Sequence, residues 1–193
     1  MIKVYGAVSA LLFLASGGSA YGADLTTIDC VSQTLDAATV ESIKADFFAR
    51  MGGARKGHPD LSPRKGGASD PEVRAKIDAA AMQCGERHGW SEAAKLAAID
   101  YGVTKLGVPA FESPVNRARI DPARIAAVVK GLPDGVREAM RHAPIPRGAL
   151  QAVYQALVAA GLPMATTKQQ MDVMGLSEWL IELESARLDF IAA

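Results

Sequence analysis

The sequence is poor in the residues and patterns that most often identify a function. Its 193 residues include only two cysteines and three histidines, and aromatic residues make up 6% of the chain. The 21 basic residues equal the 21 acidic residues in number, which excludes the basic excess typical of nucleic-acid-binding proteins. The phosphate loop Gly-x-x-x-x-Gly-Lys-Ser/Thr, the nucleophile elbow Gly-x-Ser-x-Gly and the zinc motif His-Glu-x-x-His are missing. The motifs therefore assign no reaction and no cofactor.

Only one apolar run stands out, and it lies at the start of the chain. Lys3 precedes the twelve-residue run Val4–Ala15, and the small residues Ser16–Ala20 follow it. A basic residue, then an apolar run, then small residues is the order typical of a secretory signal peptide. Twelve apolar residues fall well short of the roughly 20 that cross a bilayer. We predict a signal peptide over residues 1–20, with cleavage after Ala20 or as late as Ala23. The mature protein is then periplasmic or secreted and has no transmembrane segment.

The two cysteines support the same compartment. An even number of cysteines in an exported chain predicts one disulfide, between Cys30 and Cys84. Such a bridge would stabilise the fold by roughly 4 kcal/mol in the chain-entropy model. The alternative is a metal or haem carrier that uses Cys84 and His88, since residues at i and i+4 share a helix face. The haem-attachment motif Cys-x-x-Cys-His is not in the sequence, and no metal is predicted.

Apolar residues recur at intervals of three and four, and runs of β-branched residues are nearly absent. This pattern predicts an all-α fold, a small bundle of about five to seven short helices in one domain over residues 21–193. The length suffices to bury roughly 70% of the unfolded chain's surface, so folding needs no metal or cofactor. Capping and breaking signals predict helices at about 36–51, 70–85, 91–107, 121–131, 136–142, 147–160 and from 166 onward. Pro109 and Pro114 predict a connection over about 108–120.

The most unusual segment is the glycine-rich and basic loop at residues 52–69. It holds five glycines and a single acidic residue, Asp60, together with four cations, Arg55, Lys56, Arg64 and Lys65. A glycine-rich backbone can approach an anion closely, and four cations can hold an anionic surface, a lipid headgroup or an acidic protein. A loop of this length is either functional or a solvated connection, so these four residues are the candidate binding residues.

Catalytic residues are harder to find, and a non-catalytic role is favoured. Acidic side chains at Glu72, Asp78, Glu86, Glu92 and Asp100 lie on predicted helices, where a solvated face is their ordinary explanation. An enzyme, such as a hydrolase, would need these carboxylates to meet in a groove between helices, or one of them to meet His88 or His142.

The sequence thus favours a non-catalytic interaction or structural protein of the envelope or periplasm. Its partner would be a protein or an anionic component of the envelope, bound through the basic loop or through the amphipathic C-terminal helix. The periplasmic hydrolase and the metal or haem carrier are the alternatives.

Overall fold

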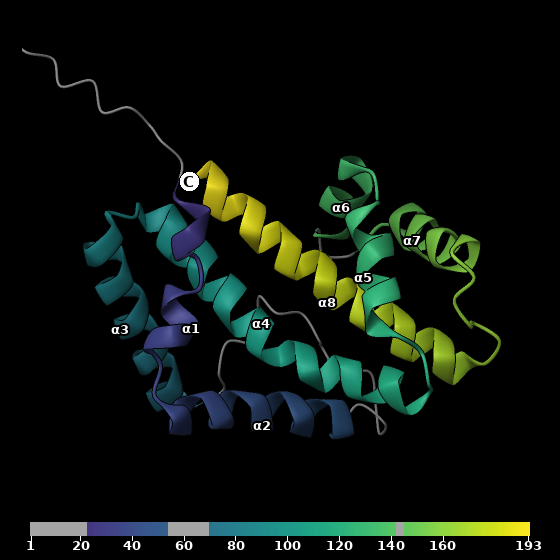
Figure 1. Ribbon diagram of the computed structural model, residues 1–193, viewed down its shortest axis with the longest axis horizontal. Helices are drawn as coiled ribbons and strands as arrows, with labels where there is room; N and C mark the ends of the chain where they lie inside the picture. The colour runs from purple at the N-terminus through teal and green to yellow at the C-terminus, as the bar shows by residue number, and fades with distance from the viewer. Residues whose placement is uncertain (1–22, 54–69, 142–144) are drawn as a thin grey trace, which may run out of the picture.

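The computed structural model describes residues 23–53, 70–141 and 145–193, and these form an all-α fold (Figure 1). The predicted signal peptide, residues 1–20, lies outside the described residues. A short 3-10 helix, η1, at Leu25–Thr27 precedes the first α-helix. The α-helices that follow are α1 (Cys30–Thr34), α2 (Ala37–Gly53), α3 (Pro71–His88), α4 (Glu92–Arg117), α5 (Pro122–Lys130), α6 (Asp134–Met140), α7 (Arg147–Ala159) and α8 (Thr167–Ala192).

Local sequence signals explain most helix starts. The carboxylates of Asp70 and Asp121 accept hydrogen bonds from the backbone N–H groups of Glu72 and Ala123, and in both helices a proline occupies the first turn. Ser91 caps α4 in the same way, by accepting from the backbone N–H of Ala94. These predicted starts are confirmed, because each depends only on residues within one turn of the cap.

Two helices of 26 residues, α4 and α8, form the centre of the bundle and lie side by side in Figure 1. They are antiparallel, since Ser91 at the start of α4 donates a hydrogen bond of 3.2 Å to the carbonyl oxygen of Ala193 beyond α8. Helices α2 and α3 pack on α4, whereas α5, α6 and α7 pack on α8. The described residues thus contain eight α-helices, and two of them are long.

The predicted connection over residues 108–120 is wrong, because α4 continues through Pro109 and Pro114 to Arg117. Each proline removes a backbone N–H that would bond the carbonyl four residues earlier, which normally ends or kinks a helix. Here Ala110, Phe111 and Val115 are almost completely buried. Burial of these apolar side chains offsets the two lost hydrogen bonds, so packing overrides the local preference.

Most of the apolar side chains of helix α8 belong to the core of the bundle. Its buried residues lie on several sides of the helix, among them Val173, Leu176, Ile181 and Phe190. These side chains pack on α4 and on α5–α7. Three large apolar side chains of α8, those of Met171, Leu188 and Ile191, remain exposed, so docking of a partner on the C-terminal helix stays a prediction.

Candidate functional site

The predicted binding residues Arg55, Lys56, Arg64 and Lys65 lie outside the described residues. The structure places only the two ends of their segment, where α2 ends at Gly53 and α3 begins at Pro71. Both flanking helices are fixed in the core through apolar side chains, Ile43 and Phe47 on α2 and Val73 and Ile77 on α3. The basic segment therefore joins two well-packed helices, and its role in binding stays a prediction.

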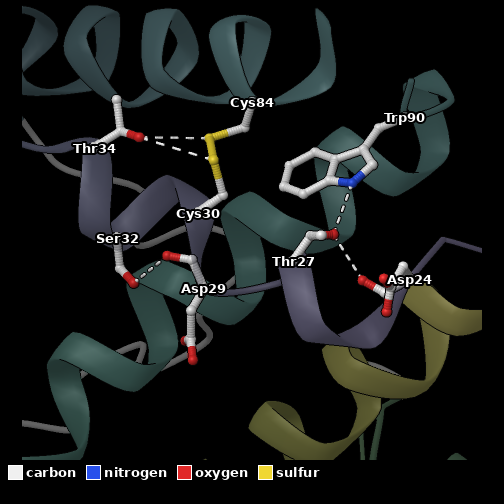
Figure 2. The surroundings of a disulfide bond; sticks show 8 residues. All are labelled: Asp24, Thr27, Asp29, Cys30, Ser32, Thr34, Cys84 and Trp90. Atoms are coloured by element: carbon white, nitrogen blue, oxygen red, sulfur yellow. Dashed lines mark hydrogen bonds between the residues drawn. A yellow bond between two sulfur atoms is a disulfide. The ribbon is translucent and has the colours of Figure 1, made fainter. Parts of the chain in front are cut away.

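The predicted disulfide is confirmed. Cys30 in α1 and Cys84 in α3 are joined, with an S–S distance of 2.04 Å and a Cα–Cα distance of 6.0 Å. Both residues are buried, and the hydroxyl of Thr34 lies 3.5 Å from Sγ of Cys84 and 3.8 Å from Sγ of Cys30 (Figure 2). The bond ties the short helix α1 to α3, which packs on the central helix α4.

Cys84 and His88, the pair in the carrier hypothesis, have separate partners in the structure. Sγ of Cys84 is bonded to Cys30, while the imidazole of His88 stacks on the indole of Trp90 with ring centroids 5.6 Å apart. A thiolate ligand at Cys84 would require this disulfide to be reduced. Within residues 23–53, 70–141 and 145–193, no three or more histidine, cysteine and carboxylate side chains come together to hold a metal.

The five carboxylates that the sequence singled out lie on the outer faces of α3 and α4. Glu72 pairs with Lys76 at 3.6 Å, Asp78 pairs with Arg74 at 3.0 Å, and Glu92 pairs with Lys95. Each pair joins residues three or four apart on one helix, which is the usual arrangement on a solvated helix surface. Glu86 and Asp100 are also exposed. His142, the other proposed partner, lies outside the described residues.

Sequence reasoning missed one carboxylate, Glu178 on α8. Burial raises the pKa of Glu178, because an ionised carboxylate loses hydration in that environment. The described part of the chain provides Glu178 with no hydrogen bond or ion pair. The signal that could have found it is its position between Ser177 and Trp179, which are both buried. A carboxyl group with a raised pKa is a candidate general acid.

A second missed feature is a charged seam between α6 and α8. Arg141, the residue directly after α6, pairs with Asp189 on α8 and also with Glu138, at 3.0 Å. One turn earlier, Arg137 pairs with Asp134 and donates to the carbonyl oxygen of Lys130 at 3.0 Å. Both guanidinium groups are mostly buried, and within the described residues neither Nε has an acceptor.

The same seam contains an ion pair within α8. Arg187 hydrogen-bonds both carboxylate oxygens of Glu184, at 2.6 and 2.8 Å. These bonds lower the pKa of Glu184, and the nearby charges of Arg137 and Lys130 act in the same direction. Helix α6 thus docks on α8 partly through charge, in addition to its buried residue Met140. The sequence could show these charges but not that α6 and α8 meet.

No protein-family model matches the chain, and the searches of curated proteins and of solved structures found no match. Among the helices of residues 23–53, 70–141 and 145–193, none has the length and apolar character needed to cross a membrane.

Proposed function

We propose that this is an exported, non-catalytic protein of the periplasm or envelope that binds an anionic partner through its basic segment at residues 52–69. The observation that supports this most is the Cys30–Cys84 disulfide. Structural disulfides form and persist in oxidising compartments and are rare in the cytosol. Together with the signal-like start of the chain, the bond favours an exported protein.

The distribution of charge supports an anionic partner. Residues 52–69 contain four cations and one acidic residue, whereas the rest of the chain from residue 21 onward has 16 basic and 20 acidic residues. A neutral protein can therefore present one strongly basic segment on a weakly acidic domain. Such a segment attracts anions over about a Debye length, roughly 8 Å at physiological salt.

The compartment is tested by an intact mass of the protein recovered from its native location, taken denatured and without reductant. We expect the loss of residues 1–20, or of up to 23 residues, and two hydrogens fewer than the reduced mass. A full-length mass with both thiols reduced would contradict export and would return Cys84 to the carrier hypothesis.

Binding is tested by neutralising the four cations together, as Arg55→Gln, Lys56→Gln, Arg64→Gln and Lys65→Gln. The matched control removes four exposed cations elsewhere, as Arg87→Gln, Arg119→Gln, Lys130→Gln and Arg147→Gln. Both variants lower the net charge by four, so a difference between them reports the segment itself.

Two probes distinguish the source of the anion, namely vesicles with phosphatidylglycerol and a polyglutamate peptide. We expect one of these probes to bind the wild-type protein and the control variant, and to lose at least tenfold in affinity with the segment variant. Binding should also weaken steeply as salt rises, because phosphate and carboxylate charges are screened. Equal loss in both variants would show a diffuse charge effect and overturn the proposal.

One observation favours a second candidate, a hydrolase. Its general acid would be Glu178, the half-buried carboxyl group with a raised pKa. A panel of ester, glycoside and peptide substrates tests this, with Glu178→Gln as the variant and the exposed Glu86→Gln as the control. Turnover that only Glu178→Gln abolishes would make the protein an enzyme.

A further inference from the structure

Three segments of the described chain meet at Trp90. The indole Nε1 of Trp90 donates a hydrogen bond of 3.1 Å to the hydroxyl of Thr27, and this hydroxyl donates to the carbonyl oxygen of Asp24 at 2.6 Å (Figure 2). The indole also contacts Phe190 near the end of α8 edge to face, with centroids 5.1 Å apart and planes at 87°. Trp90 therefore joins residues 24–28, the α3–α4 joint and the end of α8.

A titratable side chain lies on this indole. The exposed imidazole of His88, in the last turn of α3, stacks on Trp90 with centroids 5.6 Å apart and planes at 25°. This geometry lies within the range in which a cation is attracted by the face of an indole. Histidine is the side chain whose charge most often changes between pH 5 and 8.

The charged groups around His88 come from three elements. The segment that contains η1 contributes Asp24, whose carboxylate accepts from the backbone N–H of Thr26 at 2.9 Å. The bonds from Thr26 lower the pKa of Asp24, and the charge of His88 lowers it further. Helix α3 contributes Arg87, which would repel an imidazolium, while the carbonyl end of the helix attracts one. The first charge of α4, Glu92, is paired with Lys95. Asp24 is thus the carboxylate that reaches across from another segment.

We propose that His88 is a pH-responsive clasp that holds residues 24–28 against Trp90 more tightly when its imidazole is protonated. The proton changes a neutral ring stack into a cation–π contact and adds an attraction to Asp24. Both effects fix the position of the indole, and the indole holds Thr27. The segment that responds lies two residues before Cys30, so the disulfide stays in place while residues 24–28 tighten or loosen.

The two indole N–H groups of the protein provide the test and its internal control. Nε1–H of Trp90 bonds Thr27, whereas Nε1–H of Trp179 is buried and bonds the carbonyl oxygen of Thr104. Their hydrogen-exchange protection factors can be measured by NMR on the oxidised protein at pH 5 and pH 8. We expect protection at Trp90 to be about two- to fivefold greater at pH 5, the size of an exposed cation–π contact, with no change at Trp179.

Substitutions assign the effect to His88. We expect His88→Gln to remove the pH response of Trp90 and the double variant His58→Gln, His142→Gln to retain it. Asp24→Asn, which can still accept from Thr26, should reduce the response without removing it. A response that survives His88→Gln would overturn the proposal, as would equal protection of Trp90 at pH 5 and pH 8 in the wild-type protein.

Discussion

The indole Nε1 of Trp179 on α8 donates a hydrogen bond of 2.8 Å to the carbonyl oxygen of Thr104 on α4. The indole lies there because α4 has a glycine, Gly107, at the point of closest approach. Phe111 stacks on the same indole at 4.4 Å, and Phe47 of α2 meets it edge to face at 5.1 Å. Three helices thus converge on the buried indole of Trp179. The close approach of the indole to α4 requires a residue without a side chain at position 107.

We therefore predict that Gly107→Ala destabilises the protein. A Cβ at this position would lie 2.8 Å from Cζ2 of Trp179 and 3.0 Å from Cε2 of Phe47. Overpacking of this kind costs about 1–3 kcal/mol, and the better helix propensity of alanine offsets roughly 1 kcal/mol of that cost. Urea unfolding should show a net loss of up to about 2 kcal/mol.

The matched control is Gly175→Ala on α8, where a Cβ would meet no atom within 4 Å. This substitution should stabilise the protein by about 0.5–1 kcal/mol, because only the helix propensity changes. If both substitutions stabilise the protein, the rings of Trp179 and Phe47 can move to accommodate a methyl group at position 107, and the prediction is wrong.

The sequence predicted the elements that depend on neighbouring residues. Asp70, Ser91 and Asp121 each cap a helix that begins within one residue of them, so a local signal sufficed. Local signals failed at Pro109 and Pro114, where the helix continues because side chains such as Phe111 are buried against other helices. Hydrophobic spacing shows which face of a helix is apolar, but not how many neighbours will cover that face.

The same limit applies to the candidate site. The disulfide was predictable, since two cysteines allow only one pairing within the chain. The raised pKa of the half-buried Glu178 was not predictable, because it depends on the helices that cover α8. Arg141 and Asp189 are 48 residues apart, and their pairing follows from the packing of α6 on α8.

Removal of the disulfide, as Cys30→Ala with Cys84→Ala, should lower stability by roughly 4 kcal/mol. The bond joins residues 54 apart in sequence, so its loss enlarges the conformational freedom of the unfolded chain. Alanine avoids placing a polar group at the buried site of Cys84. The urea midpoint of the double variant should match that of the wild-type protein in reductant; a clear mismatch between the two would show that the alanine side chains themselves disturb the core.

Asp189→Asn should weaken the docking of α6 on α8. It removes the negative charge that Arg141 meets on another helix and leaves Glu138, on α6, as its charged partner. We expect a loss of roughly 1 kcal/mol, because the Arg141 side chain is only 19% exposed. Hydrogen exchange should accelerate in α6 more than in α2. The control is Glu41→Gln, which breaks an exposed pair with Lys44 on α2 and should change stability by less than about 0.5 kcal/mol.

Glu178→Gln should stabilise the protein at neutral pH. Burial raises the pKa of Glu178 in the folded protein above its value in the unfolded chain. Below the unfolded pKa the carboxyl group is neutral in both states and imposes no penalty. As pH rises through the folded pKa, the folded state must hold an ionised and poorly hydrated carboxylate, so stability is lost.

Glutamine does not ionise, so the variant should be more stable than the wild-type protein at pH 7, with the gain vanishing toward pH 4. Urea unfolding of both proteins from pH 4 to pH 8 measures this difference. The exposed Glu86→Gln should stay within about 0.5 kcal/mol of the wild-type protein throughout. A gain from Glu178→Gln that is the same at pH 4 and pH 7 would assign the effect to packing, since a difference in shape does not titrate.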